Sequence, residues 1–131
     1  MPKIAIIPTA FRAAAEQLNL SPGVLSGSHL FVGGVTGSAM DGSMPEDPEA
    51  QFRAAFDKIG LVLQTAGLDF DAAVEMTSYH VGLRAHFDVF NTVRTSYLTA
   101  PYPAWTAVEV PLLRREGALV EIKLIASNEP G

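Results

Sequence analysis

One helix is marked more completely than any other element in the 131-residue sequence, and it constrains everything around it. Asp47 and Pro48 mark its start, because an N-cap residue is followed by proline at the first helical position. Gly67 supplies a left-handed residue for its end. Between these signals, apolar residues recur at spacings of three and four: Phe52, Ala55, Phe56, Ile59, Leu63 and Ala66. The sequence therefore predicts an amphipathic helix with one apolar face.

Strand-like segments, rich in β-branched and aromatic residues, lie on both sides of this helix. They cover residues 3–8, 29–35, 72–82, 104–110 and 118–126. A second helix is expected from residue 83 and must end before Pro101, because a residue that precedes proline disfavours the helical conformation. Residues 9–23 contain Pro22 and lack a clean apolar stripe, so we expect mostly loop there.

The predicted order of elements is ββαβαββ, which indicates an α+β fold in a single domain over residues 1–131. Each helix follows one strand and precedes another, so each can cross over the same side of one sheet. We therefore expect one mixed sheet with two helices on one face.

Side-chain alternation predicts what each face of the sheet carries. In the last two strands one parity is uniformly apolar and should meet the helices: Val108, Val110, Val120, Ile122 and Leu124. The other parity is mixed: Trp105, Ala107, Glu109, Leu119, Glu121, Lys123 and Ile125, joined by Glu75, Thr77 and Tyr79 of the third strand. Such a face would be a large adhesive patch in water, so we expect it to pack on other copies of the chain, with pockets between subunits.

Charge and composition exclude several classes of function. Nine Lys plus Arg against fourteen Asp plus Glu give a net charge of −5, which makes nucleic acid an unlikely partner. The absence of cysteine excludes disulfides and thiol nucleophiles and suits a reducing cytoplasm. The apolar run near the N-terminus is too short for a signal peptide or a membrane span, so we expect a cytoplasmic protein without membrane contact.

Two groups of residues are candidates for chemistry. Glu121 and Lys123 lie two apart on one strand face, with Glu109 expected on the neighbouring strand. They form either an acid/base or carboxylate-binding cluster, or an ion-pair network at an interface. Gly33 and Gly34 interrupt an apolar strand, which indicates either a bulge or the close approach of a ligand.

Other motifs carry no reaction. His29, His80 and His86 lack the spacing of a metal site, and neither a phosphate-binding loop nor a dinucleotide-binding motif is present, so we expect no metal and no cofactor. The pair Arg114 and Arg115 is most simply a solvated hairpin tip, next to Gly117 as the turn residue.

Four segments resemble the RidA/YjgF family, also labelled the L-PSP endoribonuclease family. They are "HLFVGGVTG", "GLDFDAAVEMTSYHVGL", "FDVFNTV" and, most specifically, "YPAWTAVEVPLLRREGALVEIKLIA". The resemblance covers about residues 20–126. It implies a chorismate-mutase-like fold, a homotrimer, and ligand clefts between subunits. In the deaminating branch of the family, 2-imino acids and enamines are hydrolysed to 2-keto acids and ammonia.

The chain departs from that branch at the residues that carry the reaction. The family's carboxylate-clamping arginine is replaced by Trp105, and a late-strand glutamate is replaced by Lys123, although Glu121 remains. The pocket tyrosine, expected near Gly23, is absent. The resemblance still implies other cleft residues: Gly33, Gly34, Asn91, Thr106 and Ala107, with Trp105 and Lys123 at the replaced positions.

Three functions stay open on the sequence alone. The first is a trimeric protein that binds or transforms a small organic metabolite in a cleft between subunits. The second is an imine/enamine deaminase, acting on 2-iminobutanoate or 2-iminopropanoate, in which Lys123 or a nearby arginine replaces the clamp. The third is a chaperone-like or RNA-directed translation inhibitor, against which the acidic balance argues. Glu121 and Lys123 are the candidates for catalysis.

Overall fold

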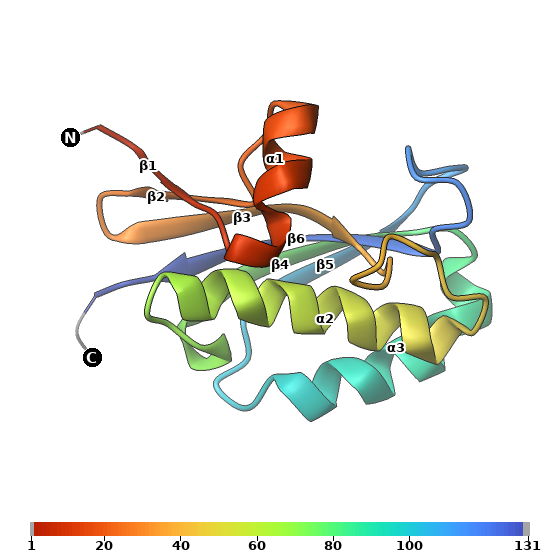
Figure 1. Ribbon diagram of the computed structural model, residues 1–131. Helices are drawn as coiled ribbons and strands as arrows, with labels where there is room; N and C mark the ends of the chain where they lie inside the picture. Colours follow the sequence, from red (N-terminus) through yellow and green to blue (C-terminus); the bar gives the residue numbers. More distant parts are fainter. Residues whose placement is uncertain (1, 130–131) are drawn as a thin grey trace.

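The computed structural model describes residues 2–129, which form one mixed six-stranded sheet with helices on both faces (Figure 1). The strand order is β1-β2-β3-β6-β4-β5. The strands are β1 (Ile4–Ile6), β2 (Gly23–Ser26), β3 (His29–Thr36), β4 (Ala73–His80), β5 (Ala104–Glu109) and β6 (Val120–Ser127). The helices are α1 (Arg12–Leu18), α2 (Pro48–Thr65) and α3 (Leu83–Tyr97), with short 3-10 turns η1 (Thr9–Phe11) and η2 (Phe70–Ala72).

Helix α2 forms where its sequence signals predict it. The Asp47 carboxylate accepts a hydrogen bond from the backbone N–H of Ala50 at 3.0 Å, and Pro48 occupies the first turn. After the helix ends, Gly67 adopts a φ of 77°, a left-handed conformation that other residues rarely adopt. The predicted apolar face, from Phe52 to Leu63, is buried. The sequence prediction for this element is confirmed.

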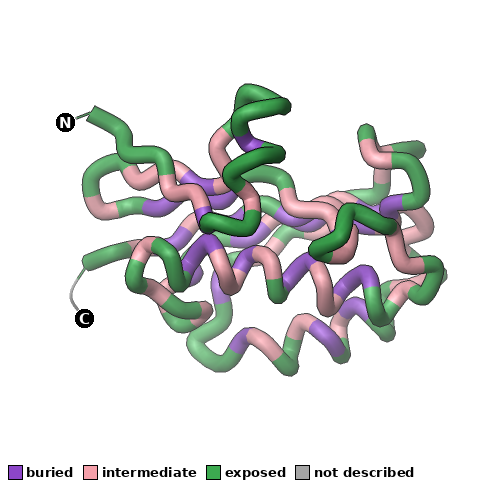
Figure 2. The backbone as a smooth tube through the Cα atoms, in the orientation of Figure 1, coloured by how far each residue is buried: buried purple, intermediate pink, exposed green. Residues whose placement is uncertain are grey.

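The hydrophobic core lies between the sheet and the pair α2 and α3, which run side by side beneath it in Figure 1. Figure 2 shows the buried residues concentrated in this layer. The helix-facing residues of β6, namely Val120, Ile122 and Leu124, are at most 1% exposed. The predicted α+β fold, with two helices on one face of a mixed sheet, is confirmed.

The prediction of loop over residues 9–23 is wrong. This segment contains η1, α1 and the start of β2, and α1 lies on the opposite side of the sheet from α2 and α3 (Figure 1). The sequence of α1 shows no apolar stripe, because this helix buries only one residue, Ala15. The helix ends at Asn19, which takes a left-handed conformation with a φ of 55°. The asparagine at residue 19 was the sequence signal that could have indicated the end of a helix.

The face assigned to β5 is also wrong. The sequence argument treated β5 and β6 as neighbours, but β4 lies between them, and β5 pairs in parallel with β4 at the edge of the sheet. The register aligns Trp105 with Met76, a buried residue on the helix face. Trp105 and Ala107 therefore face the helices, whereas Val108 lies on the open face and is 38% exposed.

The open face of the sheet is otherwise as predicted. Glu75, Thr77 and Tyr79 pair across with Ile125, Lys123 and Glu121 of β6, so all six side chains share this face. Phe31 of β3, opposite Ile125, adds an aromatic ring that is 46% exposed. Apolar and charged groups are therefore mixed over this surface.

A buried glutamine connects α2 to the segment that precedes β6. The Gln51 side-chain nitrogen donates to the carbonyls of Pro45 and Gly117 at 2.7 and 2.9 Å, and its oxygen accepts from the N–H of Leu119 at 2.9 Å. The backbone of Gln51 also lies directly against Gly37, where the chain leaves β3. This crossing fixes the position of α2 relative to the sheet.

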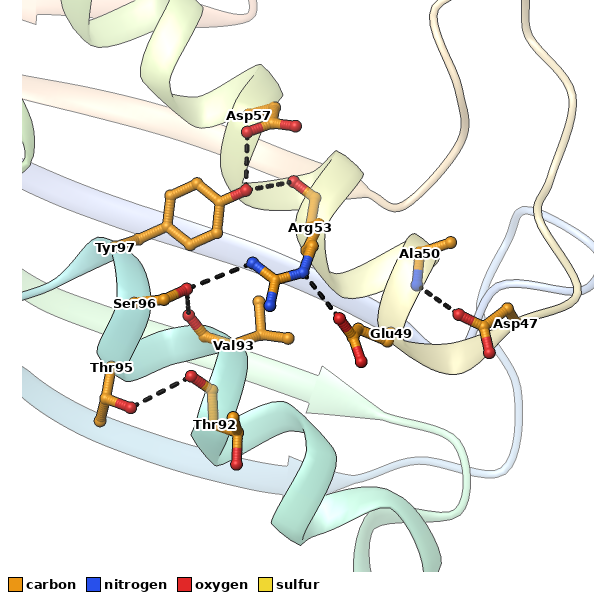
Figure 3. A network of polar contacts seen from close by, with 10 residues as sticks. All are labelled: Asp47, Glu49, Ala50, Arg53, Asp57, Thr92, Val93, Thr95, Ser96 and Tyr97. Atoms are coloured by element: carbon orange, nitrogen blue, oxygen red, sulfur yellow. Dashed lines mark hydrogen bonds and ion pairs between the residues drawn. The ribbon is translucent and has the colours of Figure 1, made fainter.

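Polar side chains join α2 to α3 on the outer surface (Figure 3). The Tyr97 hydroxyl donates to the Asp57 carboxylate at 2.7 Å. Arg53 forms an ion pair with Glu49 at 2.9 Å and reaches Ser96 at 3.4 Å. Exposed ion pairs contribute at most about 1 kcal/mol each, so these contacts orient the two helices more than they stabilise them.

Candidate functional site

Trp105, the only tryptophan in the sequence, is held in a defined place between β5 and α3. Its indole N–H donates to the Ser78 hydroxyl at 2.9 Å. The ring stacks on Phe87 with the planes 9° apart and the centroids separated by 5.9 Å, and it lies equally close to Phe90. The indole therefore fills the space between strand and helix with its one donor satisfied.

An arginine from α3 covers the outer side of this indole. The guanidinium carbon of Arg94 lies 4.2 Å from the Trp105 ring centroid and 5.8 Å from that of Tyr102. The Asn91 side-chain oxygen accepts from Arg94 Nε at 3.1 Å and from Nη2 at 2.7 Å. Cation–π contact and the amide together orient the guanidinium. A cation from the helix therefore lies on the face of the Trp105 ring.

The Ser78 hydroxyl connects Trp105 to a buried histidine. His80 Nε2 lies 2.8 Å from Ser78 Oγ, and the His80 ring meets Phe90 edge-on with centroids 4.6 Å apart. The His80 side chain is 1% exposed, and this burial lowers its pKa to about 4. His80 is therefore neutral at physiological pH and serves the core.

Acidification is expected to destabilise the protein through His80. The unfolded pKa is 6.5 and the folded pKa about 4, so the unfolded chain takes up the proton first as the pH falls. The contribution of neutral His80 to folding stability is fully present above the unfolded pKa of 6.5. About 2 kcal/mol of folding stability should be lost between pH 7 and pH 5. Urea denaturation of wild type and His80→Gln at both pH values measures the difference. Between these two pH values, His80→Gln should lose about 2 kcal/mol less folding stability than wild type.

His29, which is exposed, provides the matched control for this experiment. His29→Gln should keep the wild-type dependence on pH. A His80→Gln variant whose stability falls as steeply as that of wild type would contradict the role assigned to His80.

A second feature lies at β3, where the glycine pair forms a bulge. The pairing of β3 with β6 shifts register between Val32 and Val35, so Gly33 and Gly34 form the bulge that was one of their two sequence interpretations. The Glu121 side chain packs against Gly34, and a β-carbon there would lie 2.9 Å from the carboxyl carbon. A side chain at residue 34 would displace Glu121.

The bulge borders a hollow of about 530 Å³ between β3, α1 and the segment after β3. Its apolar walls come from residues such as Phe11, Ala14, Val35 and Met40. Its polar lining includes Ser38, Lys58, Arg114, Arg115 and Glu121. The volume falls within the range of about 300–1,000 Å³ that is typical of small-molecule sites.

The residues expected to share one cleft fall into separate groups within a single chain. Asn91 and Trp105 lie together through Arg94, with Ala107 beside Trp105 on the helix face. Gly33, Gly34 and Glu121 line the hollow. Thr106 and Lys123 lie on the open face, each opposite Thr77. Strands β6 and β4 separate the hollow from Trp105.

Glu109 does not join Glu121 and Lys123 as expected. It lies on β5, two strands from β6, and its carboxylate accepts from the N–H of Leu83 at 2.9 Å, which caps the start of α3. Nor is Arg115 part of a solvated tip, since it is half-buried and donates to the carbonyl of Gly42. The predicted cluster with Glu121 and Lys123 therefore lacks Glu109. The lining of the hollow includes Arg115, a cation that was not predicted there.

Two residues of these sites, Arg94 and Lys58, were not singled out from the sequence, and Arg115 was assigned to a solvated hairpin tip. Arg94 follows Asn91 by three residues, a spacing that places both on one side of a helix, and this signal was available. Lys58 lies in the predicted helix without any distinguishing neighbour. Its contact with Ser38 depends on the path of the chain after β3.

Comparison with known proteins places the chain in a family. The family model described as Endoribonuclease L-PSP matches residues 10–128. The chain belongs to this family, the RidA/YjgF family. It is 37% identical over 125 residues to the RutC family protein YjgH of Escherichia coli K12. The aligned residues cover 95% of this chain and 94% of YjgH.

Two solved structures show the RidA/YjgF fold in this chain. A structure of protein YJGH matches with a TM-score of 0.90 and 34% identity over 100% of both chains. RidA from the Antarctic bacterium Psychrobacter sp. PAMC 21119 matches with a TM-score of 0.77 and 30% identity, over 82% of this chain and 86% of that one. The family resemblance inferred from sequence is confirmed.

Two features are absent from residues 2–129 of this RidA/YjgF member. None of the helices in this range combines the length and the apolar character needed to cross a membrane. Within the same range, no three His, Asp or Glu side chains are grouped so that they could hold a metal ion.

Proposed function

We propose that the protein is a homotrimer that binds or transforms a small organic metabolite in clefts between its subunits. One observation carries this proposal. The Gly33–Gly34 hollow and the Asn91–Arg94–Trp105 cluster carry residues that are expected to line one cleft, yet they are separated by two strands within one chain. A cleft that includes both must be formed by two copies.

The open face of the sheet supports association of copies. Phe31 and Val108 expose apolar surface there, and Ile125 adds to it. Lys123 shares this face with Glu75 and Glu121, yet the one ion pair closer than 4.0 Å within residues 2–129 is Arg53–Glu49. Such a mixed, unpaired surface is suited to burial against another subunit.

Light scattering at micromolar concentration is expected to give three times the chain mass of 14.0 kDa. Val108→Glu should shift the protein toward monomer, because it places a charge on the open face. Val89→Glu is the matched control, since both valines are 38% exposed and Val89 lies on α3, away from that face. A folded wild-type monomer would refute the trimer.

A structure of the assembled protein tests the cleft itself. The expected result is that the Asn91–Arg94–Trp105 cluster of one subunit faces the Gly33–Gly34 hollow of its neighbour. Clusters that face open solvent in every copy would remove the claim, whatever the number of subunits.

Arg94 also favours a second candidate, hydrolysis of imino acids. A guanidinium fixed on Trp105 by Asn91 offers its remaining N–H groups for a substrate carboxylate, since within residues 2–129 these two side chains and Tyr102 are its polar and aromatic partners. If this candidate holds, Arg94→Gln abolishes ammonia release from 2-iminobutanoate. Arg84→Gln, an exposed change on the same helix, should leave it unchanged.

A further inference from the structure

The hollow beside the glycine bulge has a positively charged wall. Lys58 reaches it from α2, and its ammonium donates to the Ser38 hydroxyl at 2.8 Å. Arg115 reaches it from the segment between β5 and β6, where it donates to the carbonyl of Gly42. Two cations from distant parts of the sequence therefore line one concave surface.

No carboxylate neutralises Lys58 in the described structure. Within residues 2–129 the single ion pair closer than 4.0 Å is that between Arg53 and Glu49. Burial, aided by the positive charge of Arg115, lowers the pKa of Lys58 to about 8. A partly buried ammonium next to a second cation is unfavourable unless an anion comes to it. The chain as a whole is acidic, with a net charge of −5, so this local excess of positive charge is not a general property of its surface.

The other residues that line the hollow indicate which further groups a ligand would carry. Phe11, Ala14 and Met40 offer apolar contact for a carbon skeleton. Glu121 is the one carboxylate among the lining residues, and it repels an anionic group placed next to it. The anionic group of a ligand would therefore lie toward Lys58 and Arg115, with Glu121 left to accept a hydrogen bond from a neutral donor.

We propose that this hollow binds a small organic oxyanion, a carboxylate or a phosphate, between Lys58 and Arg115. The hollow is also the half of the proposed cleft that carries Gly33 and Gly34, so this inference deepens the proposed function and rests on it, although all the residues named here belong to a single chain. The Ser38 hydroxyl, already bonded to Lys58, holds the ammonium toward the hollow. Neither cation belongs to the Asn91–Arg94–Trp105 cluster.

Calorimetric titration with butyrate and with inorganic phosphate at pH 7 tests the proposal. Wild type should bind at least one of these probes, and which one binds identifies the class of oxyanion. Lys58→Met and Arg115→Gln should each weaken binding at least about tenfold, which is the effect of one charge-assisted hydrogen bond. The matched controls Lys3→Met and Arg84→Gln remove the same charges at exposed positions and should bind like wild type.

Titration at higher pH adds a readout that a purely structural lysine would not move. Lys58 loses its proton above about pH 8, so wild-type affinity should fall at least about tenfold between pH 7 and pH 9.5, whereas Lys58→Arg should keep its affinity. The other charged groups that line the hollow are Arg114, Arg115 and Glu121.

Three results would overturn the proposal: no binding of either probe by wild type, equal binding by Lys58→Met and Lys3→Met, or an affinity that does not change with pH. The oligomeric state, measured separately by light scattering, distinguishes this failure from that of the proposed function. A trimer that binds neither probe overturns only the oxyanion site, whereas binding to a monomer supports the site and refutes the trimer.

Discussion

The wild-type protein is expected to hydrolyse 2-iminobutanoate at least about a hundredfold more slowly than a family member with arginine at the position of Trp105. Such an arginine can hold the substrate carboxylate by two charge-assisted hydrogen bonds, each contributing roughly 1.5–3 kcal/mol. The Trp105 indole N–H is already committed to Ser78. A loss of about 3 kcal/mol in the transition state lowers the rate by about two orders of magnitude.

Trp105→Arg alone is expected to restore little of this rate. The native side chain points inward, between Phe87 and Phe90, so arginine there would bury a charge among aromatic rings. It would also meet the guanidinium of Arg94. The family resemblance also implies that Lys123 stands where the deaminating branch has glutamate, and Trp105→Arg leaves that residue unchanged.

Ammonia release, measured side by side with an arginine-bearing family member under the same conditions, decides this prediction. Equal rates would refute it and would make imine hydrolysis the leading function. Arg94→Gln, assayed beside wild type, would then show whether the guanidinium on α3 has taken over the carboxylate.

Replacing Gly37 with alanine is expected to cost at least about 3 kcal/mol of folding stability. A β-carbon at this buried position would lie 2.7 Å from both the Cα and the carbonyl carbon of Gln51, and closer still to its carbonyl oxygen. These are backbone atoms of α2, so no rotamer change relieves the clash. Moving the helix would break the three hydrogen bonds of the Gln51 side chain.

Gly33→Ala is the matched control for this substitution. A β-carbon at Gly33 would meet its nearest neighbours, the carbonyls of Ser21 and Pro22, at 3.6 Å, which is ordinary contact. Urea denaturation should therefore place Gly33→Ala near wild type and Gly37→Ala far below it. Similar midpoints for the two variants would show that α2 moves away from the sheet at little cost.

Local signals were sufficient for the elements that form the core. Asp47, Pro48 and Gly67 fixed the ends of α2, because capping and left-handed stops are decided by neighbouring residues. The face of β5 could not be obtained in this way. It depends on which strand lies beside β5, and insertion of β4 between β5 and β6 reverses the parity of Trp105 and Val108.

The candidate site was predictable only in its outline. The structure shows a bulge at Gly33 and Gly34, one of their two sequence interpretations, and a contact between Asn91 and Arg94 that the sequence did not predict. That these positions line one ligand cleft remains a prediction. The cations were harder to find, because Lys58 and Arg115 are 57 residues apart in the printed sequence and meet only through the folded chain.

Because Trp105 is the single tryptophan, the tryptophan fluorescence of the protein depends on the surroundings of this one residue. The Trp105 indole contacts Ser78 of β4 and Phe87, Phe90 and Arg94 of α3, at the junction of β5 with these two elements. Its emission during unfolding therefore follows the loss of that junction, whereas far-ultraviolet circular dichroism follows all helices and strands. If the edge strand opens before the sheet as a whole, the two transitions separate, and their offset measures the free energy of that local opening.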